Sequence, residues 1–195
     1  MADGTFRTSD GATIAYTVHA RPGAPRVALL HSLALDRSIW DGVVERLGKH
    51  AEILTFDFRG HGRSERRAGA AKAKGMRSLI DFQLTRWFSD KYRAENPEML
   101  ERIFGIFVAG DVDCYASSCA LLGDADIRGA LAGFRMPVAI VVGEEDYATP
   151  IAMSQAMKDA IPQATMKILM GGRHLTPIQC PDEISSELVE LLARV

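Results

Sequence analysis

Long apolar runs, a signal-type leader and a strong net charge are all missing from this sequence. No apolar stretch approaches the ~18–20 residues of a membrane-spanning helix. The first residues, Met1-Ala2-Asp3-Gly4-Thr5, lack the basic and apolar regions of a signal peptide. The net charge of −2 leaves no electrostatic footprint for nucleic acid or an anionic membrane. We therefore expect no nucleic-acid partner and no membrane partner.

Cysteine is also scarce, with only Cys114, Cys119 and Cys180. Their number is odd and their spacing fits no metal site. Free thiols are typical of the reducing cytoplasm, and unpaired cysteines usually pack as small apolar residues. We therefore expect a cytoplasmic protein with three free thiols and with no metal or other cofactor.

The remaining composition is that of an ordinary globular domain. Hydrophobic residues make up 47% and charged residues 25% of the 195 residues, which matches average soluble domains. A chain of this length supports one domain with a substantial core. We expect a single α/β domain over 1–195, with a core formed by 1–64 and 134–195 and a helical lid at about 75–133.

The N-terminal part predicts a hairpin followed by two strands and a helix. Alternating β-branched runs flank Ser9-Asp10-Gly11, and an Asp-Gly turn between such runs is a strong hairpin signal. Ser38 stands where the N-cap of the helix is expected. The predicted segments are 5–8 and 13–19 for the hairpin, 27–30 and 51–57 for the strands, and 40–49 for the helix. The basic stretch 65–74 predicts a solvated loop.

Two strand ends in the C-terminal part carry an acid and a histidine. Five apolar residues, Val138 to Val142, predict a strand buried on both faces, and Asp146 follows it. A second apolar run, 166–170, leads to His174. Catalytic groups collect beyond the carboxyl ends of parallel strands. We therefore expect Asp146 and His174 to meet, as the back half of a Ser…Asp…His order.

Four motifs occur in order along the chain. They are His31-Ser32-Leu33, Asp57-Phe58-Arg59-Gly60-His61-Gly62-Arg63-Ser64, Gly143-x-x-Asp146 and Gly171-Gly172-x-His174. Together they resemble the α/β-hydrolase fold. More narrowly, they resemble the 3-oxoadipate enol-lactonases, which act in the β-ketoadipate pathway of aromatic catabolism. The helical stretch 75–133, which includes 79–88, resembles the lid of that family.

The resemblance implies a role for each matching residue. Asp146 resembles the triad acid and His174 the general base. The backbone N–H of Leu33 resembles an oxyanion-hole donor. Trp87 and Phe88 would line the lid side of an apolar pocket. The implied substrate is a small lactone or ester.

The nucleophile that this chemistry requires is absent from the sequence. Such hydrolases carry G-x-S-x-G on a tight strand-to-helix turn, and no serine or cysteine here has that context. The interval from Glu65 to Lys74 is too short to hold it. The resemblance places the elbow between the Gly-His-Gly loop and the lid, so at roughly 30 residues per βαβ unit we expect two units, about 60–70 residues, to be deleted. The deleted part would include the central nucleophile strand and a neighbouring strand.

Three residues resemble catalytic groups but have more ordinary interpretations. Ser64 has the first half of the G-x-S-x-G nucleophile elbow, Gly62-x-Ser64. We nevertheless expect it to have a loop or cap role, because serine favours such positions. Ser118 lies in a small-x-Ser-x-small pattern, for which a lid helix is the favoured setting. His61 is expected to stabilise its loop, since the triad needs one histidine base.

Two interpretations of function remain open. The chain is either an ester or lactone hydrolase that is impaired or inactive for want of the serine, or a catalytically dead remnant. Such a remnant is either a deletion product or a pocket protein that binds small acids. In the second case Asp146 and His174 are an inherited, idle pair. The deletion also leaves unpaired strand edges, which either close directly into one contiguous sheet or pair between two chains as a homo-oligomer. We expect direct closure.

Overall fold

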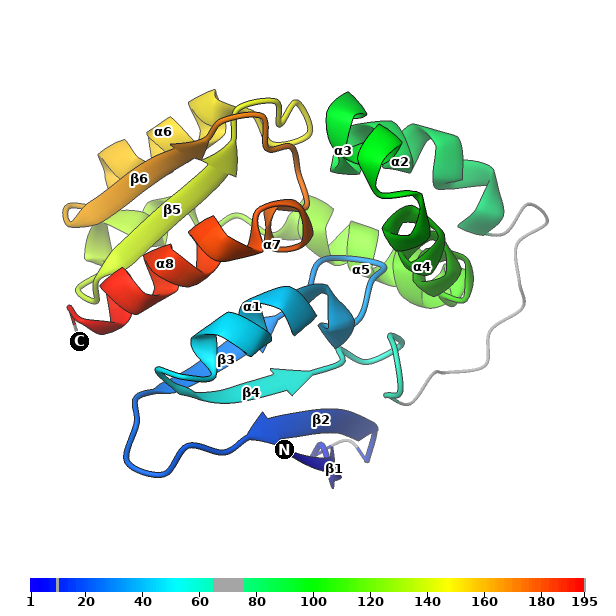
Figure 1. The fold of residues 1–195 in the computed structure, drawn as a ribbon, viewed down its shortest axis with the longest axis horizontal. Helices are drawn as coiled ribbons and strands as arrows, with labels where there is room; N and C mark the ends of the chain where they lie inside the picture. Colours follow the sequence, from blue (N-terminus) through cyan, green and yellow to red (C-terminus); the bar gives the residue numbers. More distant parts are fainter. Residues whose placement is uncertain (10, 65–75, 195) are drawn as a thin grey trace. The chain divides into compact units, whose positions relative to one another are not determined.

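The strands in the described part of this chain form two separate sheets (Figure 1). The computed structural model describes residues 1–9, 11–64 and 76–194. The strand order is β1-β2-β4-β3 in one sheet and β5-β6 in the other. Asp10 and the basic stretch predicted at 65–74 lie outside the described residues.

The first sheet begins with the predicted hairpin, which is confirmed. β1 pairs antiparallel with β2, and Gly11 in the connection has a φ of 86°, which glycine adopts at no steric cost. β2 pairs antiparallel with β4, and β4 pairs parallel with β3. The bounds are Ala2–Arg7 for β1, Thr13–His19 for β2, Arg26–Leu30 for β3 and Glu52–Phe56 for β4.

A short helical segment connects β3 to β4. It starts with the 3₁₀-helix η1 (Arg37–Trp40) and continues as α1 (Asp41–Leu47). The N-cap is Asp36, whose carboxylate accepts from the N–H of Ser38 at 3.0 Å, so the prediction of Ser38 as the cap was wrong. The N-cap lies two residues earlier than predicted because a 3₁₀ turn precedes the α-helix, so the helical segment begins at Arg37.

The part of the chain from residue 76 to residue 133 contains helices and connecting loops, as predicted. No strand lies between β4 and β5 among the described residues. The elements are η2 (Met76–Leu79), α2 (Ile80–Trp87), α3 (Asp90–Glu95), α4 (Pro97–Val108), α5 (Val112–Asp124) and η3 (Arg128–Gly133).

Within the described part of the chain, no single helix is long and apolar enough to cross a membrane. The bent pair of α4 and α5, with 91° between them, passes that test of length and composition only when the two helices are taken together.

The second sheet consists of two parallel strands with helices packed on them. β5 (Val138–Gly143) pairs with β6 (Ala164–Leu169), so that Gly143 stands opposite Leu169. α6 (Ile151–Ala160) contacts both strands, and α8 (Pro181–Leu192) contacts β5. The short α7 (Thr176–Gln179) precedes α8. The parallel pairing is as expected, but burial on both faces is not: Val138, Ala139 and Val141 are only partly buried, because one face of β5 lines a cavity.

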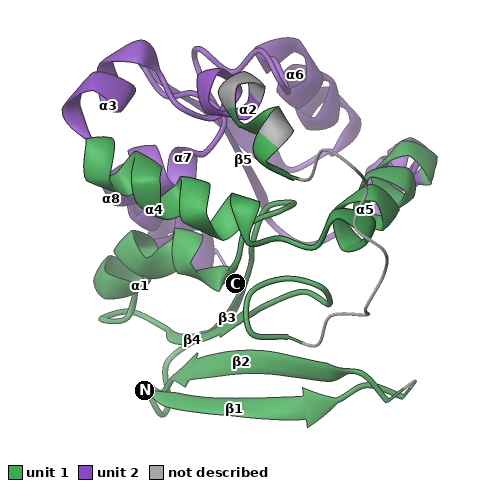
Figure 2. Ribbon diagram, turned by 90° about the vertical axis from the view of Figure 1, so that its right-hand side faces the viewer, with its two compact units in different colours: residues 1–81, 97–124 green, residues 82–96, 125–195 purple. Residues whose placement is uncertain are grey.

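The chain divides into two compact units (Figure 2). The first unit comprises Met1–Asp81 and Pro97–Asp124, and the second comprises Phe82–Asn96 and Ala125–Val195. The helical segment is therefore shared, with α4 and α5 in the first unit and α3 in the second. The division into one core and one lid stays a prediction.

The expectation of one contiguous sheet was wrong. Among the described residues, β3 is the last strand of its sheet and pairs with β4 alone, while β5 pairs with β6 alone. Each sheet is instead extended or covered by elements next to it in the sequence. The β1–β2 hairpin extends the first sheet, and α6 packs on the second. Pairing of strand edges between two chains stays a prediction.

Truncating a buried leucine of α1 should destabilise the protein far more than truncating an exposed one. Leu47 is fully buried, whereas Leu121 in α5 is 70% exposed. We expect Leu47→Ala to lower the free energy of unfolding by about 2–5 kcal/mol, because it removes apolar contacts and leaves a cavity. Leu121→Ala is the matched control, with a change within about 0.5 kcal/mol. Urea unfolding measures both, and equal losses would contradict this assignment of the core.

Candidate active site

Asp146 and His174 lie together, as the sequence predicts. Asp146 follows the end of β5 and His174 follows the end of β6. The His174 Nδ1 atom lies 2.9 Å from Asp146 Oδ2. The carboxylate is buried, and the imidazole side chain is 30% exposed. An ionised carboxylate only accepts hydrogen bonds, so Nδ1 carries a proton in this contact, and in the neutral ring the lone pair is then on Nε2.

Thr149 completes the surroundings of the Asp146 carboxylate. Oδ1 accepts from the backbone N–H groups of Ala148 and Thr149, each at 2.9 Å. Oδ2 accepts from the Thr149 hydroxyl at 2.8 Å in addition to His174. Sequence reasoning missed Thr149. Its signal is the run Asp146-Tyr147-Ala148-Thr149, in which an Asp side chain bonds to backbone N–H groups two and three residues later.

These contacts keep the Asp146 carboxyl ionised. Burial by itself would raise its pKa, but the hydrogen bonds from Thr149 and His174 together outweigh burial and lower the pKa. The ionised carboxylate holds the imidazole in one tautomer and one orientation, and it stabilises the imidazolium that forms when Nε2 accepts a proton. A pair with this geometry has the chemistry that a general base requires.

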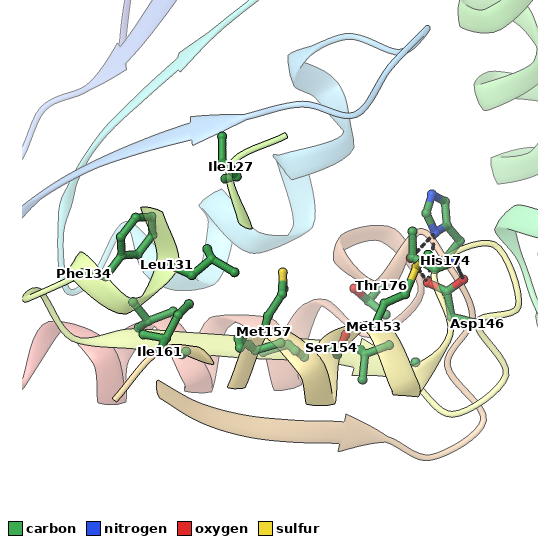
Figure 3. A pocket seen from close by; sticks show the side chains of 17 residues that line it. Ile127, Leu131, Phe134, Asp146, Met153, Ser154, Met157, Ile161, His174 and Thr176 are labelled. Carbon is green, nitrogen blue, oxygen red and sulfur yellow. Dashed lines mark hydrogen bonds and ion pairs between the residues drawn. The ribbon is translucent and has the colours of Figure 1, made fainter. Parts of the chain in front are cut away.

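A cavity of about 610 Å³ in the second unit has this pair at one end (Figure 3). Its volume falls in the range of small-molecule sites, about 300–1,000 Å³. In Figure 3, Phe134 and Leu131 lie at the end remote from Asp146 and His174, with Met157 between. The cavity is lined mostly by apolar residues, namely those of β5 together with Ile127, Leu131, Phe134, Met153, Met157 and Ile161.

Trp87 and Phe88 are buried rather than placed on the lining of this cavity. The backbone carbonyl of Trp87 accepts from the N–H of Leu175 at 3.0 Å. The Phe88 ring stacks on Tyr92 with 5.2 Å between centroids. The Trp87 carbonyl thus supports the segment that follows His174, and contact of either residue with substrate stays a prediction.

Leu33 lies in the loop after β3, in the first unit. The next residue, Ala34, has a φ of 63°, and its N–H donates to His61 Nε2 at 3.2 Å. The assignment of the Leu33 N–H as an oxyanion donor stays a prediction.

Two loop residues of the first unit have the structural roles that the sequence predicts. His61 accepts from the Ala34 N–H, and its Nδ1 lies 3.0 Å from the carbonyl of Arg59. The Ser64 hydroxyl donates to the Asp57 carbonyl at 2.6 Å and accepts from the Ala15 N–H at 2.9 Å. Ser64 is only 4% exposed. Its buried hydroxyl therefore both donates to and accepts from backbone groups.

Ser118 lies within helix α5, which confirms the helical interpretation of its small-residue pattern. Its hydroxyl donates to the carbonyl of Cys114, four residues earlier, at 2.9 Å. Such back-bonding is common for serine inside helices. The three cysteines are free. Among the residues that the structure describes, no group of three or more His, Cys, Asp or Glu side chains is arranged to hold a metal ion.

Comparison with solved structures identifies the fold as that of the α/β hydrolases. The chain matches the enol-lactonase from Burkholderia xenovorans LB400 with a TM-score of 0.91 and 23% sequence identity, over 97% of this chain and 100% of that one. A likeness at this identity establishes the fold alone. The prediction of an α/β-hydrolase fold is confirmed.

Curated relatives are similar at low identity. The chain is 22% identical over 241 residues to 3-oxoadipate enol-lactonase 1 of Acinetobacter baylyi, covering 89% of this chain and 90% of that protein. It is 26% identical over 128 residues to 3-oxoadipate enol-lactonase 2 of the same organism, covering 66% of this chain and 48% of that protein. No protein-family model matches the chain. The resemblance read from the four motifs therefore holds.

The lowered pKa of Asp146 predicts how stability depends on pH. A carboxyl whose native pKa is lowered stabilises the fold above its unfolded pKa, and this contribution is lost as the pH falls through the native pKa. We expect wild type to exceed Asp146→Asn in unfolding free energy at pH 7, with the difference shrinking below about pH 4. Denaturant unfolding at several pH values measures it. Asp159→Asn, at an exposed position, is the control; a difference for D146N that stays constant down to pH 2 would contradict the assignment.

Replacing Ser64 should affect stability and not catalysis. Ser64→Ala removes a buried hydroxyl and leaves the Ala15 N–H without its acceptor, which costs about 1–3 kcal/mol of unfolding free energy. Ser117→Ala, at an exposed helical position, is the control and should change little. Calorimetry and an ester-hydrolysis assay measure the two effects. A stable S64A protein that has lost an otherwise measurable hydrolysis would identify Ser64 as a nucleophile instead.

Proposed function

We propose that this chain is a carboxylic-ester or lactone hydrolase of the 3-oxoadipate enol-lactonase type whose turnover is impaired for want of the elbow serine. The observation that carries the proposal is the 2.9 Å contact between His174 Nδ1 and the buried, fully hydrogen-bonded Asp146 carboxylate. The relatives that carry the lactonase name support the substrate class. A lactone is a cyclic ester, so both substrates require the same acyl chemistry.

The Asp146–His174 pair supplies one part of that chemistry. With an elbow serine, the histidine would remove the hydroxyl proton, the serine oxygen would attack the carbonyl carbon, and the histidine would then protonate the leaving oxygen. Without it, Nε2 of His174 has only an unpositioned water to activate, which adds little to the uncatalysed rate. Water would add to the lactone carbonyl, the ring C–O bond would break, and the proton held by His174 would pass to the departing enol oxygen, giving an enol acid.

Three observations support the loss of the nucleophile segment. The sequence contains no G-x-S-x-G. No strand lies between β4 and β5 in the described part of the chain. The match to the Acinetobacter lactonase runs over 241 positions, more than the 195 residues of this chain, so that relative has stretches without a counterpart here. Removal of a triad serine lowers turnover by about 10⁶-fold, and binding with an intact oxyanion hole still leaves about 10³–10⁴ over water. The deleted segment would also have supplied the second oxyanion donor, so we expect most of that remainder to be lost here as well.

A second candidate function is the binding of a small carboxylic acid without turnover. The cavity of about 610 Å³ favours it, because an apolar space that ends in an acid–histidine pair suits a molecule with an apolar body and a polar end. Adipate is a suitable probe, and its binding is measured by titration calorimetry. Saturable binding that Leu131→Trp abolishes, by filling the cavity, would support this candidate.

The proposed partner is a small molecule in a reducing cytoplasm. The three free thiols support that location, and the net charge of −2 offers nothing that would attract nucleic acid. A homo-oligomer formed through strand edges is part of the same proposal, because β3 and β5 each have one edge without a partner strand among the described residues.

The proposal predicts hydrolysis close to the uncatalysed rate. We expect wild type, His174→Ala and the control His50→Ala to hydrolyse p-nitrophenyl acetate and 3-oxoadipate enol-lactone almost equally slowly, because the base has no serine to activate. His50 is exposed and belongs to the first unit. Stopped spectrophotometric assays measure the three rates. A turnover above about 1 s⁻¹ that H174A loses and H50A keeps would show that the chain has another nucleophile.

A further inference from the structure

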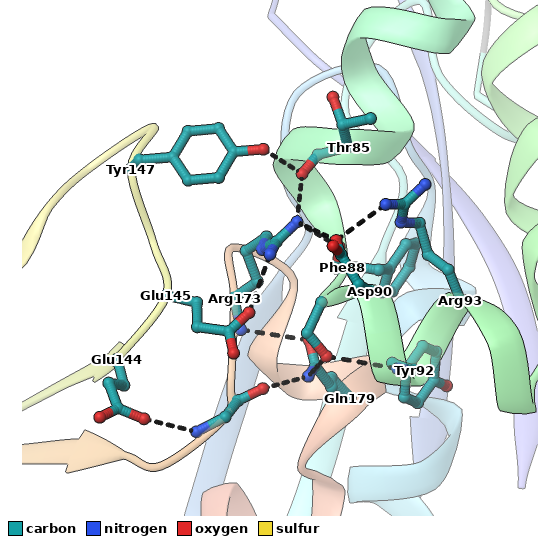
Figure 4. A network of polar contacts seen from close by, with 12 residues as sticks. Thr85, Phe88, Asp90, Tyr92, Arg93, Glu144, Glu145, Tyr147, Arg173 and Gln179 are labelled. Carbon is teal, nitrogen blue, oxygen red and sulfur yellow. Dashed lines mark hydrogen bonds and ion pairs between the residues drawn. The ribbon is translucent and has the colours of Figure 1, made fainter.

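Two charged residues next to the Asp146–His174 pair also meet each other. Glu145 immediately precedes Asp146, and Arg173 immediately precedes His174. The guanidinium Nη2 donates to Glu145 Oε2 at 2.8 Å (Figure 4). The Glu145 N–H also donates to the carbonyl of Gly172 at 2.8 Å. The loop after β5 and the loop after β6 are therefore joined by an ion pair and a backbone hydrogen bond, directly beside the pair.

The other side of the same guanidinium binds the end of helix α2 (Figure 4). Nη1 donates to the carbonyls of Thr85 and Phe88, at 2.8 and 3.0 Å, and to the Asp90 carboxylate at 3.2 Å. The last carbonyls of a helix have no partner within it, and a cation there also interacts favourably with the helix dipole. Arg173 thus anchors the turn between α2 and α3.

The position requires arginine in particular. Arg173 is only 9% exposed, and its guanidinium carbon lies 5.2 Å from the centre of the Tyr147 ring. A buried cation is tolerated only when it is paired and hydrogen-bonded. The planar guanidinium carries five N–H donors in fixed directions, whereas an ammonium is a point charge. A lysine would keep the charge but would not reach Glu145 and the helix end together.

From these contacts we infer that Arg173 is a positioning residue for the Asp146–His174 pair. It fixes the separation of the two loops that carry the pair, and it links that separation to the docking of the α2–α3 segment within the second unit. Loss of the α2–α3 contacts would then loosen the hydrogen bond between His174 and Asp146. The inference rests on the proposed function in one respect: it assumes that the hydrogen bond between His174 and Asp146 is the contact that matters for catalysis.

The test measures the hydrogen bond itself rather than turnover. A histidine Nδ1–H bonded to a carboxylate gives a proton resonance far downfield in the NMR spectrum, separate from the backbone amides. We expect wild type to show this resonance for His174, with His174→Ala identifying it. Arg173→Met removes the charge and the donors while keeping an unbranched side chain, and we expect the resonance to be lost through faster exchange with solvent.

Arg128→Met is the matched control. Arg128 belongs to the same unit and pairs with Asp126, but it is 86% exposed and lies apart from the two loops. R128M should keep the resonance unchanged. Glu145→Gln removes only the charge that joins the loops, so we expect a resonance that is broadened but still present. A merely structural role for Arg173 would lower the unfolding midpoint of R173M while leaving the resonance intact below it, and that result overturns the inference.

If R173M fails to fold, Arg173→Lys replaces it in the test, because lysine keeps the buried positive charge. Retention of a sharp His174 resonance in R173K would overturn the inference, and its loss in a cooperatively folding protein would support it. The outcome is independent of the hydrolysis assay. A wild-type chain without turnover still reports the hydrogen bond, so failure of the proposed function and failure of the Arg173 role are distinguishable.

Discussion

The parallel pairing of β5 with β6 is the constraint on which the candidate site depends. Its register sets Gly143 opposite Leu169, so both strands end at the same level and the two following loops leave side by side. A Cβ atom on Gly143 would lie 2.4 Å from the carbonyl oxygens of Gly172 and Arg173. Glycine at this position therefore lets the backbones approach closely enough for Asp146 and His174 to bond.

The support of this pair is contained in one unit. The Thr149 hydrogen bonds, the Arg173 contacts and the Leu175–Trp87 backbone bond all join residues of the second unit. The geometry of the acid–histidine pair is therefore set by hydrogen bonds made within the second unit. The orientation of the imidazole does not depend on a contact with a nucleophile.

Sequence patterns predicted what local signals and strand ends determine. The Asp-Gly hairpin, the helical stretch and the meeting of Asp146 with His174 follow from turn chemistry, periodicity and the rule for parallel strands. Thr149 and Arg173 were missed because their roles depend on contacts made only after the loops fold. The contiguous sheet was wrong for a related reason: strand pairing is non-local, and apolar patterning does not specify which edges meet.

Two methionines of α6 give the cavity a sensitivity to oxidants. Met153 is 58% and Met157 41% exposed, and both line the cavity. Peroxide converts such thioethers to sulfoxides, which are polar and chiral. The flexible, polarisable wall that adapts to an apolar guest would then present two strong dipoles to it. Oxidation would therefore make the lining of this cavity more polar without touching Asp146 or His174, and methionine sulfoxide reductases would reverse the change.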